Sequence, residues 1–202
     1  MIEKKLLNRI EQSGISYKNF MELTQNKIDD KTFRNNEKYD VTKLNLQRSN
    51  RIYRTYNVNE ELKNSILKID TPHIWMVITE DWCGDSAQNL PYISKIAEMN
   101  PLIELKIILR DSNLDIMDLY LTDGNSRSIP KLVAFDKDGD EIFQWGPRPK
   151  SAQKKVEDGK RSGLTKDEYL ANLHSWYAEN KGKDLEGEFL ELLTKINFPL
   201  HS

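Results

Sequence analysis

The chain has 202 residues with a single cysteine, and its 30 basic and 32 acidic residues leave a net charge of −2. This length suits one sizeable core with appended elements and is too short for two domains of the usual size. The near-neutral balance removes the overall field that attracts proteins to nucleic acid or to acidic membranes, so we expect neither partner.

The sequence predicts a soluble cytoplasmic protein without a metal site. The segment Met1–Leu6 lacks the apolar run of a signal peptide, and no stretch approaches the roughly 18 apolar residues of a membrane span. One cysteine excludes an intramolecular disulfide and a multi-cysteine zinc site. His73, His174 and His201 are scattered without ligand spacing, so we interpret them as surface or packing histidines.

Residues 1–70 are predicted to form a polar helical extension that packs on the core. Apolar residues recur there at helical spacing, and Asp40 and Asn59 stand where they could cap the third and fourth helices. The residues that mark the four predicted helices are Leu6, Leu7 and Ile10; Phe20, Met21 and Leu23; Leu44, Arg48, Ile52 and Tyr56; and Leu62 and Ile66.

Three arginines in this extension, Arg48, Arg51 and Arg54, are spaced three residues apart. Residues at this spacing share one face of a helix. We interpret the row as a solvated helix face, and an anion-binding site is the alternative.

The pattern changes at residue 73, where strands and helices begin to alternate. The run 74–79 is apolar throughout, as in a strand buried on both faces. A helix through 87–97, a strand at 105–109 and a helix at 114–121 follow. This order predicts parallel strands joined by a crossover helix.

A β-hairpin and further helices complete the predicted fold. The segments 131–135 and 141–145 flank Asp136–Asp140, a turn rich in residues that tolerate positive φ. Beyond it, Thr165–Glu168 matches a capping box, and a last helix begins near Asp184. We therefore expect an α/β protein in which residues 71–202 form a mixed sheet sandwiched by helices, with a helical C-terminal segment.

The cysteine lies where the first buried strand gives way to a helix, in Trp82-Cys83-Gly84. Pro91 falls inside that helix, Ser128-Ile129-Pro130 immediately precedes the hairpin, and Gly146 ends its second strand. This arrangement resembles the thioredoxin fold and its active-site segment. The resemblance covers about residues 72–146 and one C-terminal helix.

The resemblance implies that Cys83 is the reactive thiol. It further implies that the Ile129-Pro130 bond is cis, faces the thiol and presents backbone to a substrate chain as a short strand pairing. Trp82, Gly84 and Arg148 are expected to support this site.

The sequence departs from the thioredoxin pattern in Cys-Gly-Asp-Ser. Thioredoxins have a resolving cysteine where Ser86 stands, and a hydroxyl cannot replace it because exchange passes from sulfur to sulfur. Asp85 replaces the usual proline, and we expect it to cap the helix in a reciprocal bond with Gln88. Ser86 could donate a hydrogen bond to the sulfur.

Opposing charges are predicted to leave the thiol only mildly acidified. A helix N-terminus favours a thiolate by about 0.3–1 kcal/mol, whereas Glu80, Asp81 and Asp85 oppose it. Arg148 could offset these acids, or it could be an ordinary exposed arginine. We expect a pKa for Cys83 near the free value of about 8.5 or somewhat below.

Two classes of function follow. In the first, Cys83 acts as a monothiol on a protein or small-thiol disulfide, without a bound cofactor, and an external low-molecular-weight thiol releases it. In the second, the fold is a non-catalytic binding or adaptor module and Cys83 is a small buried hydrophobe. The sequence gives no sign of oligomeric state.

Overall fold

The computed structural model describes residues 2–197, so His201 lies outside the described part. Within that part, no helix has the length and hydrophobicity of a membrane span. The elements in chain order are α1 (Ile2–Ser13), α2 (Tyr17–Asp29), η1 (Phe33–Asn35), α3 (Tyr39–Thr55), α4 (Glu60–Ile66), β1 (His73–Thr79), α5 (Gly84–Ala97), β2 (Ile103–Leu109), η2 (Arg110–Ser112), α6 (Leu114–Met117), β3 (Lys131–Phe135), β4 (Glu141–Trp145), α7 (Lys150–Arg161), α8 (Lys166–Asn180) and α9 (Lys183–Asn197).

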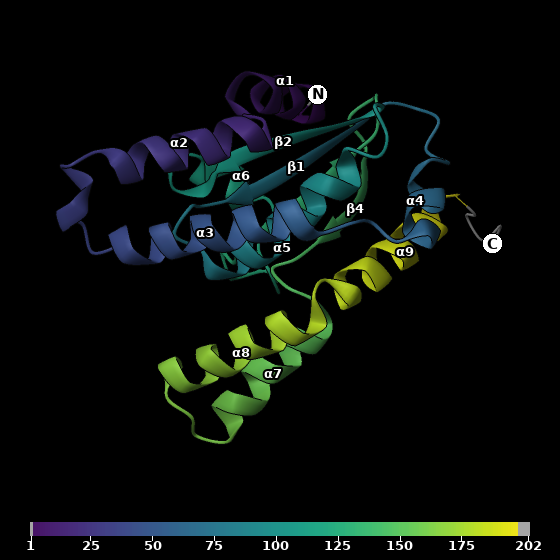
Figure 1. Ribbon diagram of the computed structural model, residues 1–202. Coiled ribbons are helices and arrows are strands. Elements are labelled where there is room, and N and C mark those ends of the chain that lie inside the picture. Colours follow the sequence, from purple (N-terminus) through teal and green to yellow (C-terminus); the bar gives the residue numbers. More distant parts are fainter. Residues whose placement is uncertain (1, 198–202) are drawn as a thin grey trace.

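The strands form a four-stranded sheet in the order β2-β1-β3-β4 (Figure 1). Strand β1 pairs parallel with β2 through the crossover helix α5, and antiparallel with β3. Strand β4 extends the sheet as the second arm of the β3–β4 hairpin. The predicted α/β fold with a mixed sheet and flanking helices is therefore confirmed.

The sheet separates two apolar layers. Helices α2 to α5 and α9 supply one layer, whereas α1 and α6 supply the other, together with the chain around Cys83. The strands alternate between the layers, so Trp75 and Val77 face the first and Met76 and Ile78 face the second. Cys83 thus belongs to the α1–α6 side of the sheet.

The N-terminal helices share these layers with the sheet. Ile10 of α1 is fully buried among the residues around Cys83, and Phe20 of α2 and Ile52 of α3 are buried in the opposite layer. Ile15, between α1 and α2, forms an isolated antiparallel bridge with Ile107 at the edge of β2. The extension is part of the hydrophobic core.

The helix ends show which local signals decide a boundary. The side chain of Asn59 accepts the backbone N–H of Leu62 and caps α4, as predicted. The prediction for Asp40 is wrong, because α3 begins at Tyr39 and Asp40 lies in its first turn. In the first turn, the positive end of the helix dipole still stabilises a carboxylate.

Two predicted helix faces are also wrong in detail. Leu23 and Leu44 are exposed to solvent, although they were expected to mark the apolar faces of their helices. The helix predicted at 114–121 ends at Met117, and Leu119 is exposed. Single leucines on a surface are common, since polar atoms cannot cover a whole protein.

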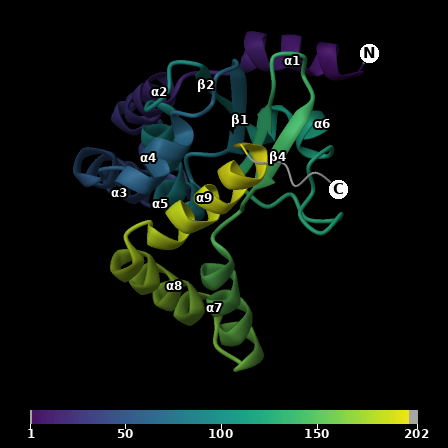
Figure 2. The same ribbon diagram turned by 90° about the vertical axis from the view of Figure 1, so that its right-hand side faces the viewer.

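The segment after the hairpin contains a helix that the sequence analysis did not assign. Helix α7 has few buried side chains, among them Ala152 and Val156, so its apolar signal is weak. It packs against α8, which begins with the predicted capping box of Thr165 and Glu168. Figures 1 and 2 show α7 and α8 as a pair that projects away from the sheet.

Candidate active site

Cys83 occupies the N-cap position of α5, directly after the loop that follows β1. Its own side chain makes no capping hydrogen bond. The residue keeps 8% of its accessible surface and packs in the same apolar cluster as Ile78, Met117 and Ile129. The thiol therefore lies at a helix N-terminus but in largely apolar surroundings.

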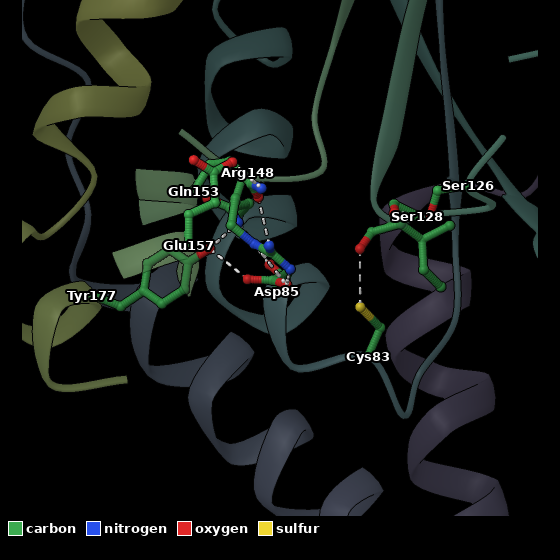
Figure 3. Close-up of polar contacts among 10 residues, drawn as sticks. Cys83, Asp85, Ser126, Ser128, Arg148, Gln153, Glu157 and Tyr177 are labelled. Atoms are coloured by element: carbon green, nitrogen blue, oxygen red, sulfur yellow. Dashed lines mark hydrogen bonds and ion pairs between the residues drawn. The ribbon is translucent and has the colours of Figure 1, made fainter. Parts of the chain in front are cut away.

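The thiol faces the segment that precedes the hairpin. Its Sγ atom lies 3.2 Å from the carbonyl oxygen of Ile129 and donates a hydrogen bond to it (Figure 3). The next peptide bond, Ile129-Pro130, is cis. Gly146 has a φ of 117° and contacts this segment closely, because a Cβ there would lie 2.2 Å from the carbonyl oxygen of Pro130.

All three acidic residues near Cys83 form bonds with other parts of the chain, and two of them precede the thiol. Glu80 is buried and accepts the backbone N–H of Asp111 at 2.7 Å. Asp81 pairs with Lys27 of α2 at 2.7 Å, and its carbonyl oxygen accepts the amide of Asn45 in α3. The N-terminal helices thus fix the loop that leads to the thiol.

Asp85 forms an ion pair instead of the predicted helix cap. Its Oδ2 atom accepts two hydrogen bonds from the guanidinium of Arg148, at 2.5 and 3.1 Å, and its Oδ1 accepts the hydroxyl of Tyr177 at 2.7 Å. Gln88, the expected reciprocal partner, lies 3.5 Å from the ring of His174. Figure 3 shows Asp85 and Cys83 directed to opposite sides of the helix end.

Arg148 accordingly reaches the site and is not an ordinary exposed arginine. The Arg148 and Asp85 side chains keep only 18% and 12% of their accessible surface. Gln153 of α7 accepts a further hydrogen bond from Arg148 at 2.7 Å. Burial and the charge of Asp85 raise the pKa of Tyr177 well above its usual value, so its hydroxyl stays protonated and donates.

The pKa of Cys83 is raised, which corrects the expectation of a mildly acidified thiol. Burial is the largest cause and the negative charge of Asp85 is the second. The Ser86 hydroxyl and the backbone N–H groups of Ser86 and Asp85 lower the pKa, but their effect is smaller. Desolvation disfavours the thiolate more than the helix end favours it.

Two cations flank the ring of Trp82 beside the thiol. The Lys38 amine lies 4.6 Å from the ring centroid, and the Arg110 guanidinium lies 4.8 Å from it. Arg110 also donates to the carbonyl oxygen of Arg127, close before Ile129 in the chain. Trp82 is partly exposed, so the two cations lie against a surface residue that directly precedes Cys83.

A family model described as thioredoxin matches residues 31–161, which is more than half of the chain. The chain belongs to the thioredoxin family. The matched segment is wider than the motifs indicated, because it includes part of the N-terminal extension and helix α7.

Solved structures share the fold of this thioredoxin-family chain. A protein of unknown function from Pseudomonas aeruginosa is 17% identical, with a TM-score of 0.61, and the match covers 93% of this chain and 96% of that one. An HIV epitope scaffold is 18% identical, with a TM-score of 0.58, covering 92% and 96%. No curated protein matches the sequence. At these identities the likeness concerns the fold alone.

The sequence analysis of this thioredoxin-family protein did not assign two residues, His174 and Tyr177, to the site. His174 of α8 lies so close to Gly84 that a Cβ there would be 3.3 Å from the imidazole ring. Tyr177 binds Asp85, although 92 residues separate them in the chain. No local motif marks either residue, because folding alone brings α8 to the end of α5.

The remaining predicted residue, Ser86, is buried at the first turn of α5. Its hydroxyl accepts a hydrogen bond from Thr79 at 2.5 Å, which leaves its own proton free to be directed to the sulfur. In the described part of the chain, no group of three His, Cys, Asp or Glu residues could hold a metal ion. The site therefore offers one thiol, one charged pair and backbone carbonyls.

Proposed function

We propose that this protein catalyses monothiol thiol–disulfide exchange through Cys83. The observation that carries the proposal is the position of the thiol, 3.2 Å from the Ile129 carbonyl oxygen at the N-terminus of α5. This position sets a nucleophile beside a backbone segment that can pair with an extended substrate. The thioredoxin family match supports a redox role for such a thiol.

The reaction proceeds in two balanced exchange steps. The Cys83 thiolate attacks one sulfur of a disulfide, forming a mixed disulfide and releasing the other sulfur as a thiolate. A second, external thiolate then attacks the sulfur of the bound group, forming a new disulfide and returning Cys83 to its reduced state. The external thiol is required because the sequence has no second cysteine. Such chemistry suits a reducing compartment such as the cytoplasm.

The raised pKa of Cys83 makes this exchange slow in the free protein. A substrate backbone that takes over the Ile129 carbonyl would remove the bond that now holds the protonated thiol. Arg148 neutralises the charge of Asp85 and limits its opposition to the thiolate. We infer that a substrate backbone bound at Ile129, the peptide backbone of glutathione disulfide included, activates the thiol.

A specific observation also favours the second candidate, a non-catalytic binding module. Cys83 is buried with 8% of its surface accessible, and burial raises its pKa. A thiol in that state is a small apolar side chain with weak reactivity. In this case the segment at Ile129 would bind a partner without covalent chemistry.

Intact-mass spectrometry separates the two candidates. The native protein is incubated with glutathione disulfide as the probe, and then with excess reduced glutathione. Exchange predicts an adduct of one glutathione that the added thiol removes, and no adduct on Cys83→Ser. If the native protein stays unmodified while the urea-unfolded protein is modified, the exchange proposal is wrong and the binding module is supported.

A further inference from the structure

A groove of about 680 Å³ lies between α3, α5 and the turn that joins α8 to α9. The aromatic rings of Tyr92 and Tyr177 are among the residues that line it, together with the amide side chains of Gln88 and Asn57. Amides can donate hydrogen bonds to an anion, and tyrosine rings provide a flat apolar surface. The groove therefore combines polar donors with space for a small molecule.

The charged residues of this groove are predominantly cationic. Arg51, Lys181 and Lys183 line it, and across residues 2–197 none of these three has a carboxylate within ion-pair distance. The acidic residue of the groove, Glu186, accepts hydrogen bonds from the neutral donors Tyr56 and Asn59, so the groove has three cations against one acid.

The positive charge extends along α3. Burial and the nearby charge of Arg51 both lower the pKa of Arg48, one turn earlier in the helix. Arg48 in turn lowers the pKa of His174, whose largest cause of lowering is burial. The charges of Arg48 and Arg51 repel each other, and an anion in the groove would relieve that repulsion.

The turn between α8 and α9 holds two of the cations in place. Lys181 adopts the left-handed conformation with φ of 52°, and Gly182 follows with φ of 85°. A Cβ at Gly182 would lie 2.5 Å from the ring of Tyr92, so the turn packs directly on the aromatic wall of the groove. Lys181 and Lys183 are therefore carried by a turn of defined position.

A second cavity of the molecule provides the contrast. It measures about 470 Å³, lies between α2 and α3, and is lined by one cation, Lys18, and two acids, Glu22 and Glu98. Its charge balance does not favour an anion. The charge balance thus differs from one hollow to another, and the first groove has three cations against one acid.

We propose that the groove binds a small anion that carries at least two phosphate or carboxylate groups. Arg51 on one wall and Lys181 and Lys183 on the other bind the anionic groups, and Gln88 and Asn57 donate hydrogen bonds. This assigns Arg51 to an anion site, the alternative that the arginine row had left open. The proposal is independent of the chemistry at Cys83.

Isothermal titration calorimetry of the full chain tests the proposal with pyrophosphate and with citrate as probes. We expect saturable binding of one probe molecule per chain, by at least one of the two, and the comparison tells phosphate from carboxylate preference. Arg51→Gln and Lys181→Asn should each weaken binding about five- to tenfold, as should a rise in salt concentration. Asparagine tolerates the left-handed conformation of residue 181.

The controls distinguish a built site from general attraction of anions. Lys18→Gln removes a cation from the second cavity and should leave the affinity unchanged, as should Cys83→Ser. The proposal is overturned if neither probe binds saturably, or if the folded Lys181→Asn protein binds as tightly as the unchanged chain. Equal weakening by Lys18→Gln would overturn it as well.

Discussion

The N-terminal turn of α5 has an apolar side around Cys83 and a polar side around Asp85. Cys83 points into apolar surroundings and donates to the carbonyl oxygen of Ile129, whereas Asp85 points to Arg148 and Tyr177 and accepts their hydrogen bonds. Both residues lie at the N-terminus of α5, which is the positive end of its helix dipole. Desolvation and bonding partners, and not the dipole, therefore decide which side chain carries charge.

The difference explains why one thiol can be both well placed and weakly acidic. The ion pair compensates the charge of Asp85 two residues from the sulfur, but it does not replace the water that burial removed from Cys83. Changes on the two sides should consequently have separable effects. The following predictions test this separation, from the largest expected effect to the smallest.

Gly146→Ala should give the largest loss of stability, because its new side chain would clash with the segment opposite Cys83. The new Cβ would lie 2.2 Å from the Pro130 carbonyl oxygen, at a φ of 117° that alanine rarely adopts. We expect a decrease of about 3 kcal/mol or more in the free energy of unfolding, measured by urea denaturation. Gly163→Ala is the matched control, since its φ is 75° with no atom within 4 Å, and it should cost only about 1 kcal/mol. Equal losses in both variants would contradict the close contact.

Arg148→Gln tests the polar side. It leaves the largely buried carboxylate of Asp85 without its guanidinium partner, and we expect a loss of about 2–4 kcal/mol in unfolding free energy. Arg161→Gln breaks the exposed ion pair with Asp158 and should leave the free energy of unfolding nearly unchanged. A loss for Arg148→Gln no greater than that control would show that the pair contributes little to the fold.

Asp85→Asn should make the thiol more acidic, because it removes a negative charge that raises the pKa of Cys83. The rate of alkylation by iodoacetamide, measured against pH, should reach its midpoint at a lower pH than in the unchanged protein. Arg148→Gln should shift the midpoint in the opposite direction. Asp158→Asn, which lies in the exposed pair on α7, is the control that should not move it. A common midpoint for all four proteins would refute the coupling across the helix end.

The pH dependence of stability should show the smallest effect. The folded pKa of Cys83 lies above its unfolded value, so the folded chain holds the thiol proton longer. This contribution is complete below the unfolded pKa, about 8.5, and is lost as pH rises through the folded pKa. Urea unfolding between pH 7 and 10 should therefore show a steeper decline for the unchanged protein than for Cys83→Ser. Parallel curves would argue against burial of the thiol as the cause.

The fold could be predicted largely from local patterns. The apolar run 74–79 predicted β1 (His73–Thr79) to within one residue, and the apolar segments that flank the turn Asp136–Asp140 predicted the observed bounds of the hairpin, 131–135 and 141–145. Helix α7 could not be predicted in the same way, because its few apolar residues find their partners only on α8. Asp40 failed as a cap because α3 begins at Tyr39, two residues before the first helical position that a cap at Asp40 predicts.

The candidate site, like the fold, has features that local patterns predict and features that only packing decides. Motif positions predicted that the cis Ile129-Pro130 segment faces Cys83, but they left the role of Arg148 open and did not predict the state of the thiol. That state depends on how deeply the sulfur is buried and on partners such as Tyr177, which lie far away in the chain. A local sequence pattern predicts neither the burial of the sulfur nor its distant partners.

The sequence by itself determined the mixed α/β sheet, the placement of one thiol where a buried strand meets a helix, and the absence of a second cysteine. These follow from hydrophobic periodicity and residue identity, which act over a few neighbours. Tertiary structure alone decided that Asp85 binds Arg148, that Cys83 is desolvated, and that cations from α3 and from the α8–α9 turn share one groove. The physical reason is that burial and charge pairing depend on distances in space, and only the packed chain sets those distances.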